Sequence, residues 1–150
     1  MKRLYQIAAL CLLSFSLKAQ NSPVSWAFSA VKLADKTYEV HLTATVQSGW
    51  HLYSQAQPED AVVNPTEIKF HPNPLVNVSG KTAEKGKLEK FHDEKLGISA
   101  NQYAEKVDFV QVVKLKAKAK TSVAGTVEFQ TCDDKKCLPP KKVSFSIAII

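Results

Sequence analysis

The sequence predicts an all-β protein, a single antiparallel β-sandwich that follows an N-terminal signal peptide. Several short runs alternate apolar and polar residues with a period of two, which is typical of half-buried strands. Turn residues separate these runs, and no stretch shows helical periodicity of useful length. About 130 residues remain after the signal peptide, which is enough for one domain with its own core.

The first 19 residues have the organisation of a secretory signal peptide. Lys2 and Arg3 give a positive start, and residues 7–17 form the apolar run "IAALCLLSFSL". This run is too short to cross a bilayer, which needs about 20 apolar residues. Ala19 supplies the small residue expected before a cleavage site. We therefore predict a signal peptide at residues 1–19 and an exported chain, soluble after cleavage, at residues 20–150.

The charge of the mature chain is mildly positive. Cleavage removes two lysines and one arginine and leaves 17 basic and 14 acidic residues, a net charge of +3. This small excess does not indicate a nucleic acid partner. The lysines of "KLKAKAKT", residues 114–121, are typical of a solvated strand end that blocks edge pairing. No nucleic acid partner is therefore expected.

The strands of the first half follow from the alternation. Residues 38–46 alternate over nine positions, with Tyr38 and Val46 at the two ends of the apolar set. Trp26 and Phe28 alternate in the same way upstream, and "LADKTY" supplies a turn between the two runs. Shorter strands are expected at residues 68–70 and 75–78.

The second half predicts three further strands. They are expected at residues 107–115, where Gln111 interrupts the apolar face, at residues 127–131 and at residues 143–149. Residues 80–104 are highly charged and are the least regular part of the chain. We expect a short strand plus a long loop there, and a long loop in a compact domain is usually functional or mobile.

Two cysteines remain in the mature chain, in the stretch "TCDDKKCLPP". Strands are predicted on both sides of it, so "DDKK" fits a four-residue hairpin loop. Opposed residues of such a hairpin have Cα atoms about 4.5–5.5 Å apart, close enough for a disulfide between Cys132 and Cys137. Strand parity groups Cys132 with Glu128 and Gln130, so we expect it to point away from the core.

Three interpretations of the cysteine pair follow from the residues. An exported chain usually oxidises a single pair, and a purely structural hairpin disulfide is the simplest interpretation. Closing so small a ring contributes only about 2 kcal/mol, and Pro139 and Pro140 leave an open edge, which favours a redox-active pair. A metal site is disfavoured because zinc needs four ligands and the histidines are scattered. Both disulfide interpretations remain open.

The chain also resembles a known family. The segment "TVEFQTCDDKKCLPPKKVSFSI" resembles the active-site hairpin in the N-terminal periplasmic domain of DsbD-type thiol:disulfide interchange proteins. The stretch "SGWHLYSQ" is similar to the glycine–aromatic–X–Leu–Tyr stretch beside the cysteines of that family. The stretch "HDEKLG", residues 92–97, resembles the loop that caps the disulfide. The resemblance covers nearly all of the mature chain.

The resemblance implies a fold and a set of site residues. It implies an immunoglobulin-like β-sandwich at residues 20–150, with a redox hairpin at residues 126–150 and no cofactor other than the redox-active disulfide. The site residues that it implies are the redox couple Cys132 and Cys137, the lining residues His51 and Tyr53, and the cap-loop residues Asp93 and Glu94. The capping positions, often aromatic in the family, are Lys95 and Leu96 here, with Phe91 as the aromatic side chain that can substitute.

The resemblance also implies an activity. The protein is expected to be a periplasmic thiol:disulfide oxidoreductase that takes electrons from a membrane-embedded thiol reductase on a separate chain. It would pass them to periplasmic thioredoxin-like proteins, for disulfide correction or cytochrome c maturation. The alternative is a non-catalytic secreted binding module with a structural hairpin disulfide. In that alternative Leu52 faces the core while His51 and Tyr53 simply lie on the outer face of their strand.

Overall fold

The computed structural model of the chain describes residues 22–150, so the predicted signal peptide at residues 1–19 lies outside the described residues. No helix within residues 22–150 has the length and apolar character needed to cross a membrane. The described part forms eleven strands. They are β1 (Val24–Ala34), β2 (Thr37–Val46), β3 (His51–Tyr53), β4 (Glu67–Phe70), β5 (Val76–Gly86), β6 (Glu89–Asp93), β7 (Ile98–Tyr103), β8 (Lys106–Leu115), β9 (Thr121–Phe129), β10 (Thr131–Cys132) and β11 (Lys141–Ile149).

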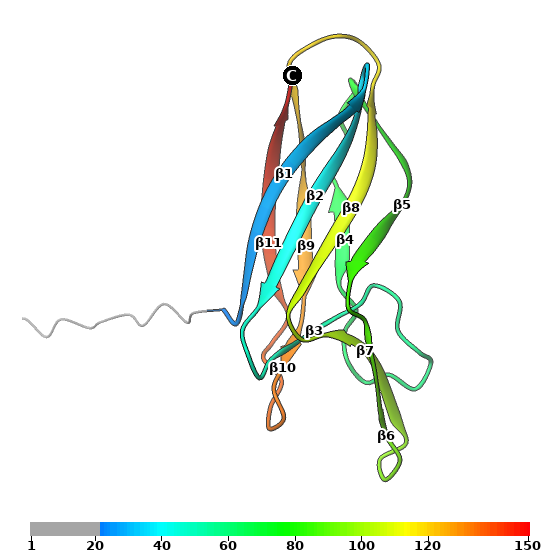
Figure 1. Cartoon of the computed structure of the whole chain (residues 1–150), viewed down its shortest axis with the longest axis vertical. Coiled ribbons are helices and arrows are strands. Elements are labelled where there is room, and N and C mark those ends of the chain that lie inside the picture. Colours follow the sequence, from blue (N-terminus) through cyan, green and yellow to red (C-terminus); the bar gives the residue numbers. More distant parts are fainter. Residues whose placement is uncertain (1–21) are drawn as a thin grey trace, which may run out of the picture.

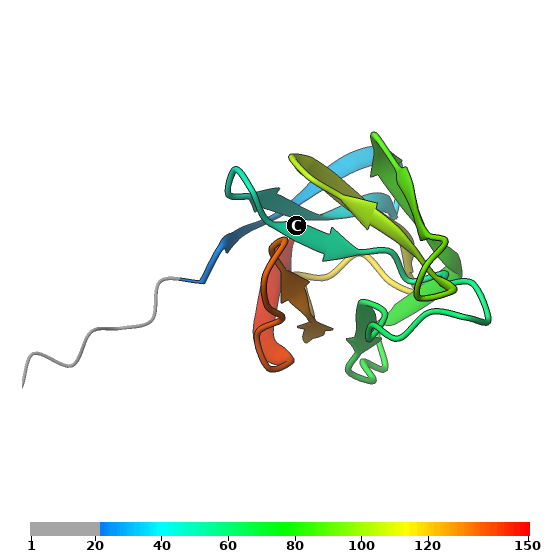
Figure 2. The ribbon, with the colours of Figure 1, turned by 90° about the horizontal axis from the view of Figure 1, so that it is seen from below.

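Two sheets face each other and form the sandwich (Figure 1). One has the strand order β1-β2-β8-β5 and the other β11-β9-β4, with antiparallel pairing throughout. The view from below in Figure 2 separates these two layers. A third sheet, of order β10-β3-β7-β6, continues from one end of the sandwich. The predicted all-β antiparallel sandwich is confirmed.

The alternation of β2 places its apolar side chains in the core. All five apolar residues of the period-two run, Tyr38, Val40, Leu42, Ala44 and Val46, are buried. Their polar neighbours are only partly buried or exposed. The same pattern holds in the C-terminal strand β11, where Phe145, Ile147 and Ile149 are buried. Burial on one face of each strand fixes the register, because a slip by one residue would turn the apolar set outward.

Aromatic rings join the two sheets across the core. The Trp26 ring centroid lies 5.9 Å from that of Phe109 in β8 and 5.3 Å from that of Phe129 in β9. The Phe145 ring of β11 lies 5.5 Å from the Phe28 ring of β1. Such pairs contribute about 0.5–1.5 kcal/mol beyond their buried area. The contact to Phe129 also fixes the end of β9, from which the cysteine hairpin continues.

Buried Gln111 interrupts the apolar face of β8 because it completes the hydrogen bonding of β5. The register between β5 and β8 shifts between Ser79 and Ala83. The Gln111 side chain donates to the Ser79 carbonyl at 2.8 Å and accepts from the Thr82 hydroxyl at 2.7 Å. A buried amide is tolerated when its polar atoms are paired in this way.

The prediction for residues 80–104 is wrong in its second part. β5 extends to Gly86, and β6 and β7 form a hairpin where a long loop was expected. Pairing runs from Glu89 opposite Gln102 to Asp93 opposite Ile98. Apart from Phe91, the β6 side chains are polar, so the sequence gives no period-two signal there. Backbone pairing and the turn at residues 94–97 define this hairpin instead.

Gly125 in the middle of β9 leads to a stability prediction. A Cβ atom added there would meet the Lys69 carbonyl oxygen and lie 2.6 Å from the tip of the Phe145 ring. We expect Gly125→Ala to lower the free energy of unfolding by about 1–3 kcal/mol, because overpacking a fixed core forces side chains and backbone apart. Urea denaturation monitored by tryptophan fluorescence measures this difference.

The matched control is Ser146→Thr, which adds one methyl group on the exposed side of neighbouring β11. It should change the free energy of unfolding by less than about 0.5 kcal/mol. Equal effects of the two substitutions would contradict the account of close sheet packing at Gly125.

Candidate functional site

Cys132 and Cys137 form a disulfide across a four-residue loop. Their Cα atoms are 3.9 Å apart, and the two residues form an isolated antiparallel bridge. The Asp133 amide donates to the Lys136 carbonyl at 2.9 Å, and the Leu138 amide donates to the Thr131 carbonyl at 2.8 Å. The predicted hairpin loop "DDKK" is therefore confirmed, with backbone hydrogen bonds on both sides of the disulfide.

The predicted orientation of Cys132 is wrong. Parity along an unbroken strand placed it with the polar residues, but Cys132 is only 4% exposed. β9 ends at Phe129, and the chain then changes sheets, so that Thr131 and Cys132 pair with β3. The change of sheet after Gln130 breaks the alternation, and Thr131 and Cys132 are both buried.

The two cysteines differ in exposure. Cys132 packs in a small buried cluster with Tyr53 of β3 and Ala100 of β7. Val63 from the β3–β4 loop packs against this cluster. Cys137 is exposed at the start of the segment that leads to Pro139 and Pro140. One end of the disulfide is therefore shielded by protein, while the other is open to a second molecule.

Strand register places several predicted site residues on one face of the third sheet. Cys132 lies opposite His51, and Tyr53, two residues along β3, lies opposite Gln102. Because directly opposed residues share a face and side chains alternate along a strand, Ala100 joins this face. The register thus places Cys132, His51 and Tyr53 on the same face of neighbouring strands.

Tyr53 and His51 differ in burial. Tyr53 is buried, so it does not simply lie on an outer face, as the alternative of a binding module expected. Burial raises the pKa of its hydroxyl above the ordinary value of 10.0, so the ring is neutral at physiological pH. Its backbone carbonyl accepts a hydrogen bond from the Thr66 hydroxyl, which holds the start of the β3–β4 loop. His51 is half-buried beside the disulfide.

Phe91 is the capping side chain that the register brings nearest to the buried cysteine. It lies opposite Ala100, which packs against Cys132, so both share the face of the site. Phe91 is 45% exposed, and its ring therefore stands open beside the buried cluster.

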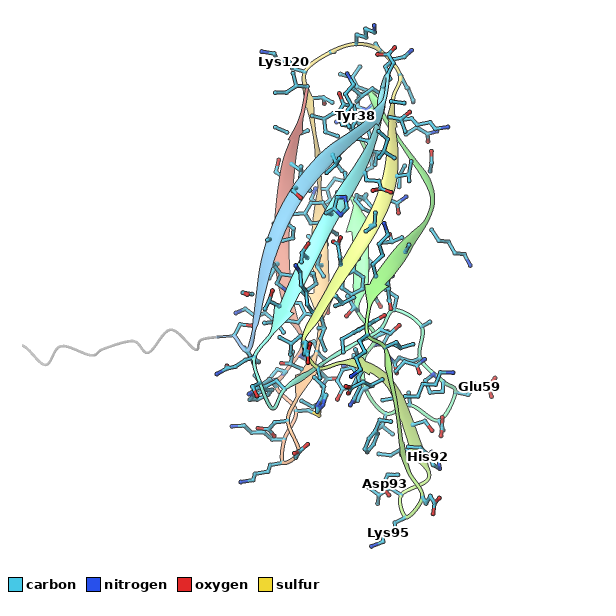
Figure 3. All side chains as sticks on the ribbon, in the orientation of Figure 1. Tyr38, Glu59, His92, Asp93, Lys95 and Lys120 are labelled. Atoms are coloured by element: carbon cyan, nitrogen blue, oxygen red, sulfur yellow. A yellow bond between two sulfur atoms is a disulfide. The ribbon has the colours of Figure 1, made fainter. Side chains whose placement is uncertain are left out.

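The tip of the β6–β7 hairpin does not reach the cysteine loop. The Asp93 carboxylate accepts from the Lys95 and Leu96 amides at 2.9 and 3.0 Å, and Gly97 has a left-handed φ of 64°. Glu94 is exposed, and Leu96 is 70% exposed. None of the hydrogen bonds within residues 22–150 joins this tip to residues 132–137. Figure 3 shows Asp93 and Lys95 at the lower end of the molecule.

Glu84 is a supporting residue that sequence reasoning missed. Its carboxylate accepts hydrogen bonds from the Ser54 hydroxyl at 2.8 Å, the Gln55 amide at 2.7 Å and the Tyr103 hydroxyl at 2.6 Å. Burial and the contact with Glu84 strongly raise the pKa of Tyr103. Glu84 therefore ties β3 and β7, which carry the site, to β5 of the sandwich. Its position in a charged run gave no sequence signal.

Metal binding has no structural support in the described residues. No group of three or more His, Cys, Asp or Glu side chains within residues 22–150 is arranged to hold a metal ion.

Comparison with known proteins identifies related domains. The family model for "Thiol:disulfide interchange protein DsbD, N-terminal" matches residues 18–149. No curated protein matches the chain. The solved complex between the DsbD N-terminal and PilB N-terminal domains from Neisseria meningitidis is similar, with a TM-score of 0.51 and 16% identity. The similarity covers 87% of this chain and 87% of that chain.

Two further solved structures are similar. The N-terminal periplasmic domain of ScsB from Proteus mirabilis has a TM-score of 0.50 and 16% identity, over 84% of this chain and 44% of that chain. The N-terminal domain of Neisseria meningitidis DsbD in the reduced form has a TM-score of 0.49 and 19% identity, over 82% of this chain and 84% of that chain. At such identities, the similarity concerns the fold.

The shielding of Cys132 predicts unequal thiol reactivity in the reduced protein. Iodoacetamide should modify Cys137 first, because Cys132 lies under Tyr53. Tyr53→Ala should speed the modification of Cys132 by at least about tenfold, since loss of the ring lowers the cost of exposing that thiol by more than about 1.4 kcal/mol. Peptide mass spectrometry of quenched samples gives both rates.

Leu52→Ala is the control for lost stability. Leu52 is fully buried on the opposite face of β3, so its truncation destabilises the domain without uncovering Cys132 directly. If both substitutions speed the modification of Cys132 equally, the cause is lower stability of the whole domain. The claim that Tyr53 shields Cys132 is then wrong.

The loop carboxylate Asp133 predicts a pH dependence. Its Oδ1 accepts from the Lys135 and Lys136 amides at 2.8 and 2.7 Å, and these hydrogen bonds hold its pKa below the ordinary value of 3.8. A lowered pKa in the folded state stabilises the protein above pH 3.8, and this contribution is lost as the pH falls through the folded-state pKa.

The wild type should therefore lose its advantage over Asp133→Asn as the pH is lowered below 3.8. Urea denaturation across a pH series measures the two unfolding free energies. Asp134→Asn is the matched control, because it removes a neighbouring carboxylate but neither of these hydrogen bonds. A pH-independent difference between wild type and Asp133→Asn would refute the assignment.

Proposed function

Because the chain belongs to the family of N-terminal domains of the thiol:disulfide interchange protein DsbD, we propose that it exchanges its Cys132–Cys137 disulfide with the thiols of other proteins in the periplasm. One observation carries this proposal. The disulfide closes a loop of only four residues at one end of the molecule, with Cys137 exposed and Cys132 buried. Such a bond restrains little of the unfolded chain but is accessible for exchange.

The difference in exposure gives the two sulfurs separate roles. In the reduced protein the Cys137 thiolate attacks one sulfur of a partner disulfide and forms a mixed disulfide, and the partner's other sulfur leaves as a thiolate that takes a proton. Cys132, deprotonated in turn, attacks the Cys137 sulfur. The Cys132–Cys137 disulfide is restored, and the partner leaves with two thiols. Two electrons and two protons have then passed to the partner.

The surrounding residues support this exchange without taking part in bond formation. Tyr53 keeps Cys132 covered, so that the Cys132 sulfur reacts with the mixed disulfide and not with unrelated molecules in solution. We propose that His51, directly opposite Cys132 in the register, donates a hydrogen bond to a leaving sulfur. Phe91 and Leu96 offer exposed apolar surface to a docked partner. Asp93 shapes the turn that presents Leu96, and Glu94 adds a charge at the tip.

The direction of electron flow that we propose follows the family. A membrane-embedded thiol reductase on a separate chain supplies electrons, and periplasmic thioredoxin-like proteins receive them for disulfide correction or cytochrome c maturation. The periplasmic location of the Proteus mirabilis ScsB domain and the complex of the Neisseria meningitidis domain with a PilB domain support such a setting. It also requires export, for which we propose residues 1–19 as the signal peptide and residues 20–150 as the mature domain.

Trapping of mixed disulfides tests the proposal. Cys132→Ala removes the resolving sulfur, so partners attacked by Cys137 should accumulate as covalent complexes in periplasmic extracts. Non-reducing gel electrophoresis should show these complexes, and dithiothreitol should release them. Mass spectrometry of the released proteins should identify thioredoxin-like proteins.

Cys137→Ala is the matched control, since it also leaves a single cysteine but a buried one. It should trap at least about tenfold less, because exposing Cys132 costs more than about 1.4 kcal/mol. If Cys132→Ala captures no partner, or if both variants capture the same proteins equally, the proposed exchange through Cys137 is wrong. The first outcome would favour the binding module with a structural disulfide.

A further inference from the structure

The end of the molecule opposite the disulfide is rich in lysine. The β1–β2 turn, the end of β8 and the β8–β9 loop meet there, and Figure 3 shows Lys120 and Tyr38 at this end and Asp93 and Lys95 at the other. We call its basic side chains the lysine pole. The pole consists of Lys32, Lys36, Lys114, Lys116, Lys118 and Lys120.

Backbone pairing holds the segments of the pole together. Thr37, next to Lys36, lies opposite Lys114 in the β2–β8 register. The Leu115 amide donates to the Lys36 carbonyl at 2.8 Å, and the Lys116 amide donates to the Leu75 carbonyl at 2.9 Å. The lysines are therefore gathered by the fold and are not merely neighbours in the sequence.

The positive charge of the pole exceeds the net positive charge of the whole domain. Its six lysines are accompanied by one acidic residue, Asp35, which pairs with Lys118 at 3.4 Å. The other described residues carry eleven lysines and thirteen carboxylates, so the rest of the domain is slightly acidic. The net charge is small, but the charged residues are distributed unevenly along the long axis. Such a distribution orients a molecule in the electric field of a charged partner.

The surface of the pole combines cationic and apolar groups. Lys32, Lys36, Lys118 and Lys120 line a hollow of about 290 Å³, with Tyr38 among its other lining residues. The Lys32 ammonium lies 6.0 Å from the centroid of the Tyr38 ring. Val31 and Leu33, the neighbours of Lys32 in β1, are apolar and about half exposed, at 50% and 52%. Strand alternation turns Val31 to the outer face of the sheet, on the side away from Lys32.

We propose that the lysine pole binds the surface of a bilayer that contains anionic phospholipids. Lysines attract headgroup phosphates, and neighbouring aliphatic side chains can enter the boundary between headgroups and acyl chains. Nucleic acid offers phosphates as well, but it offers no apolar phase to Val31 and Leu33. Each lysine near such a surface strengthens binding about fivefold at low salt.

The proposal goes beyond the exchange of disulfides and does not depend on the cysteines. Because the disulfide hairpin lies at the far end of the long axis, a domain bound through the pole keeps Cys137 free of the bilayer (Figure 1). Binding to the surface would also keep the domain close to a membrane-embedded electron donor. Association would be weak and reversible, since salt screens such attraction.

Vesicle sedimentation tests the proposal on the mature domain. Vesicles of equal parts phosphatidylglycerol and phosphatidylcholine should bind it, and vesicles of phosphatidylcholine alone should not. Binding should be lost in about 1 M salt, where the Debye length falls to about 3 Å. The variant Lys116→Gln, Lys118→Gln, Lys120→Gln should bind about a hundredfold more weakly.

A second triple variant controls for net charge. Lys87→Gln, Lys90→Gln, Lys95→Gln removes the same charge at the other end and should leave vesicle binding within about threefold of wild type. Equal losses in the two variants would overturn the assignment to the pole, as would binding to duplex DNA as strong as that to the anionic vesicles. Absence of binding to both kinds of vesicle would also overturn it. Cys132→Ala should bind vesicles like wild type, so this result is separate from the test of exchange.

Discussion

The site depends on the change of sheet between Phe129 and Thr131. β9 ends against the Trp26 ring inside the sandwich, and two residues later the chain pairs with β3 in another sheet. This transfer buries Cys132 beneath Tyr53 while the four-residue loop returns Cys137 to the surface. If the hairpin had continued in the sheet of β9, the alternation of side chains along the strand would by itself have decided whether each cysteine was exposed or buried. The unequal exposure on which the proposed chemistry rests therefore comes from the pairing of β10 with β3.

Sequence reasoning predicted the parts of the fold in which burial on one face decides the structure. The run at residues 38–46 and the terminal strand each carry a period-two signal that burial confirms. The pairing around the loop "DDKK" was predicted from the length of the loop, and Cys132 and Cys137 do form a bridge there. Strand β6 carries no such signal, because its residues apart from Phe91 are polar and all of them are exposed or only partly buried. The orientation of Cys132 could not be predicted either, because no local feature of Gln130 indicates that the strand changes sheets there.

The candidate site was predicted unevenly for related reasons. Cys132, His51 and Tyr53 come together because short strands of the third sheet pair in a definite register. Family resemblance pointed to these residues, and no pattern within the sequence linked residues 51–53 to residue 132. Glu84 remained unnoticed because a carboxylate in a charged run normally faces solvent, and here it accepts hydrogen bonds from Ser54 and Tyr103. Long-range polar contacts of this kind depend on the assembled sandwich.

The central claim is that the disulfide serves exchange and not stability, and its reduction potential tests this most directly. Equilibration of the mature domain with glutathione buffers, followed by alkylation and mass analysis, measures that potential. The account predicts a value between about −270 and −120 mV, within the range of thioredoxin-like exchange proteins. A value below about −300 mV, as for disulfides that only stabilise secreted proteins, would contradict it.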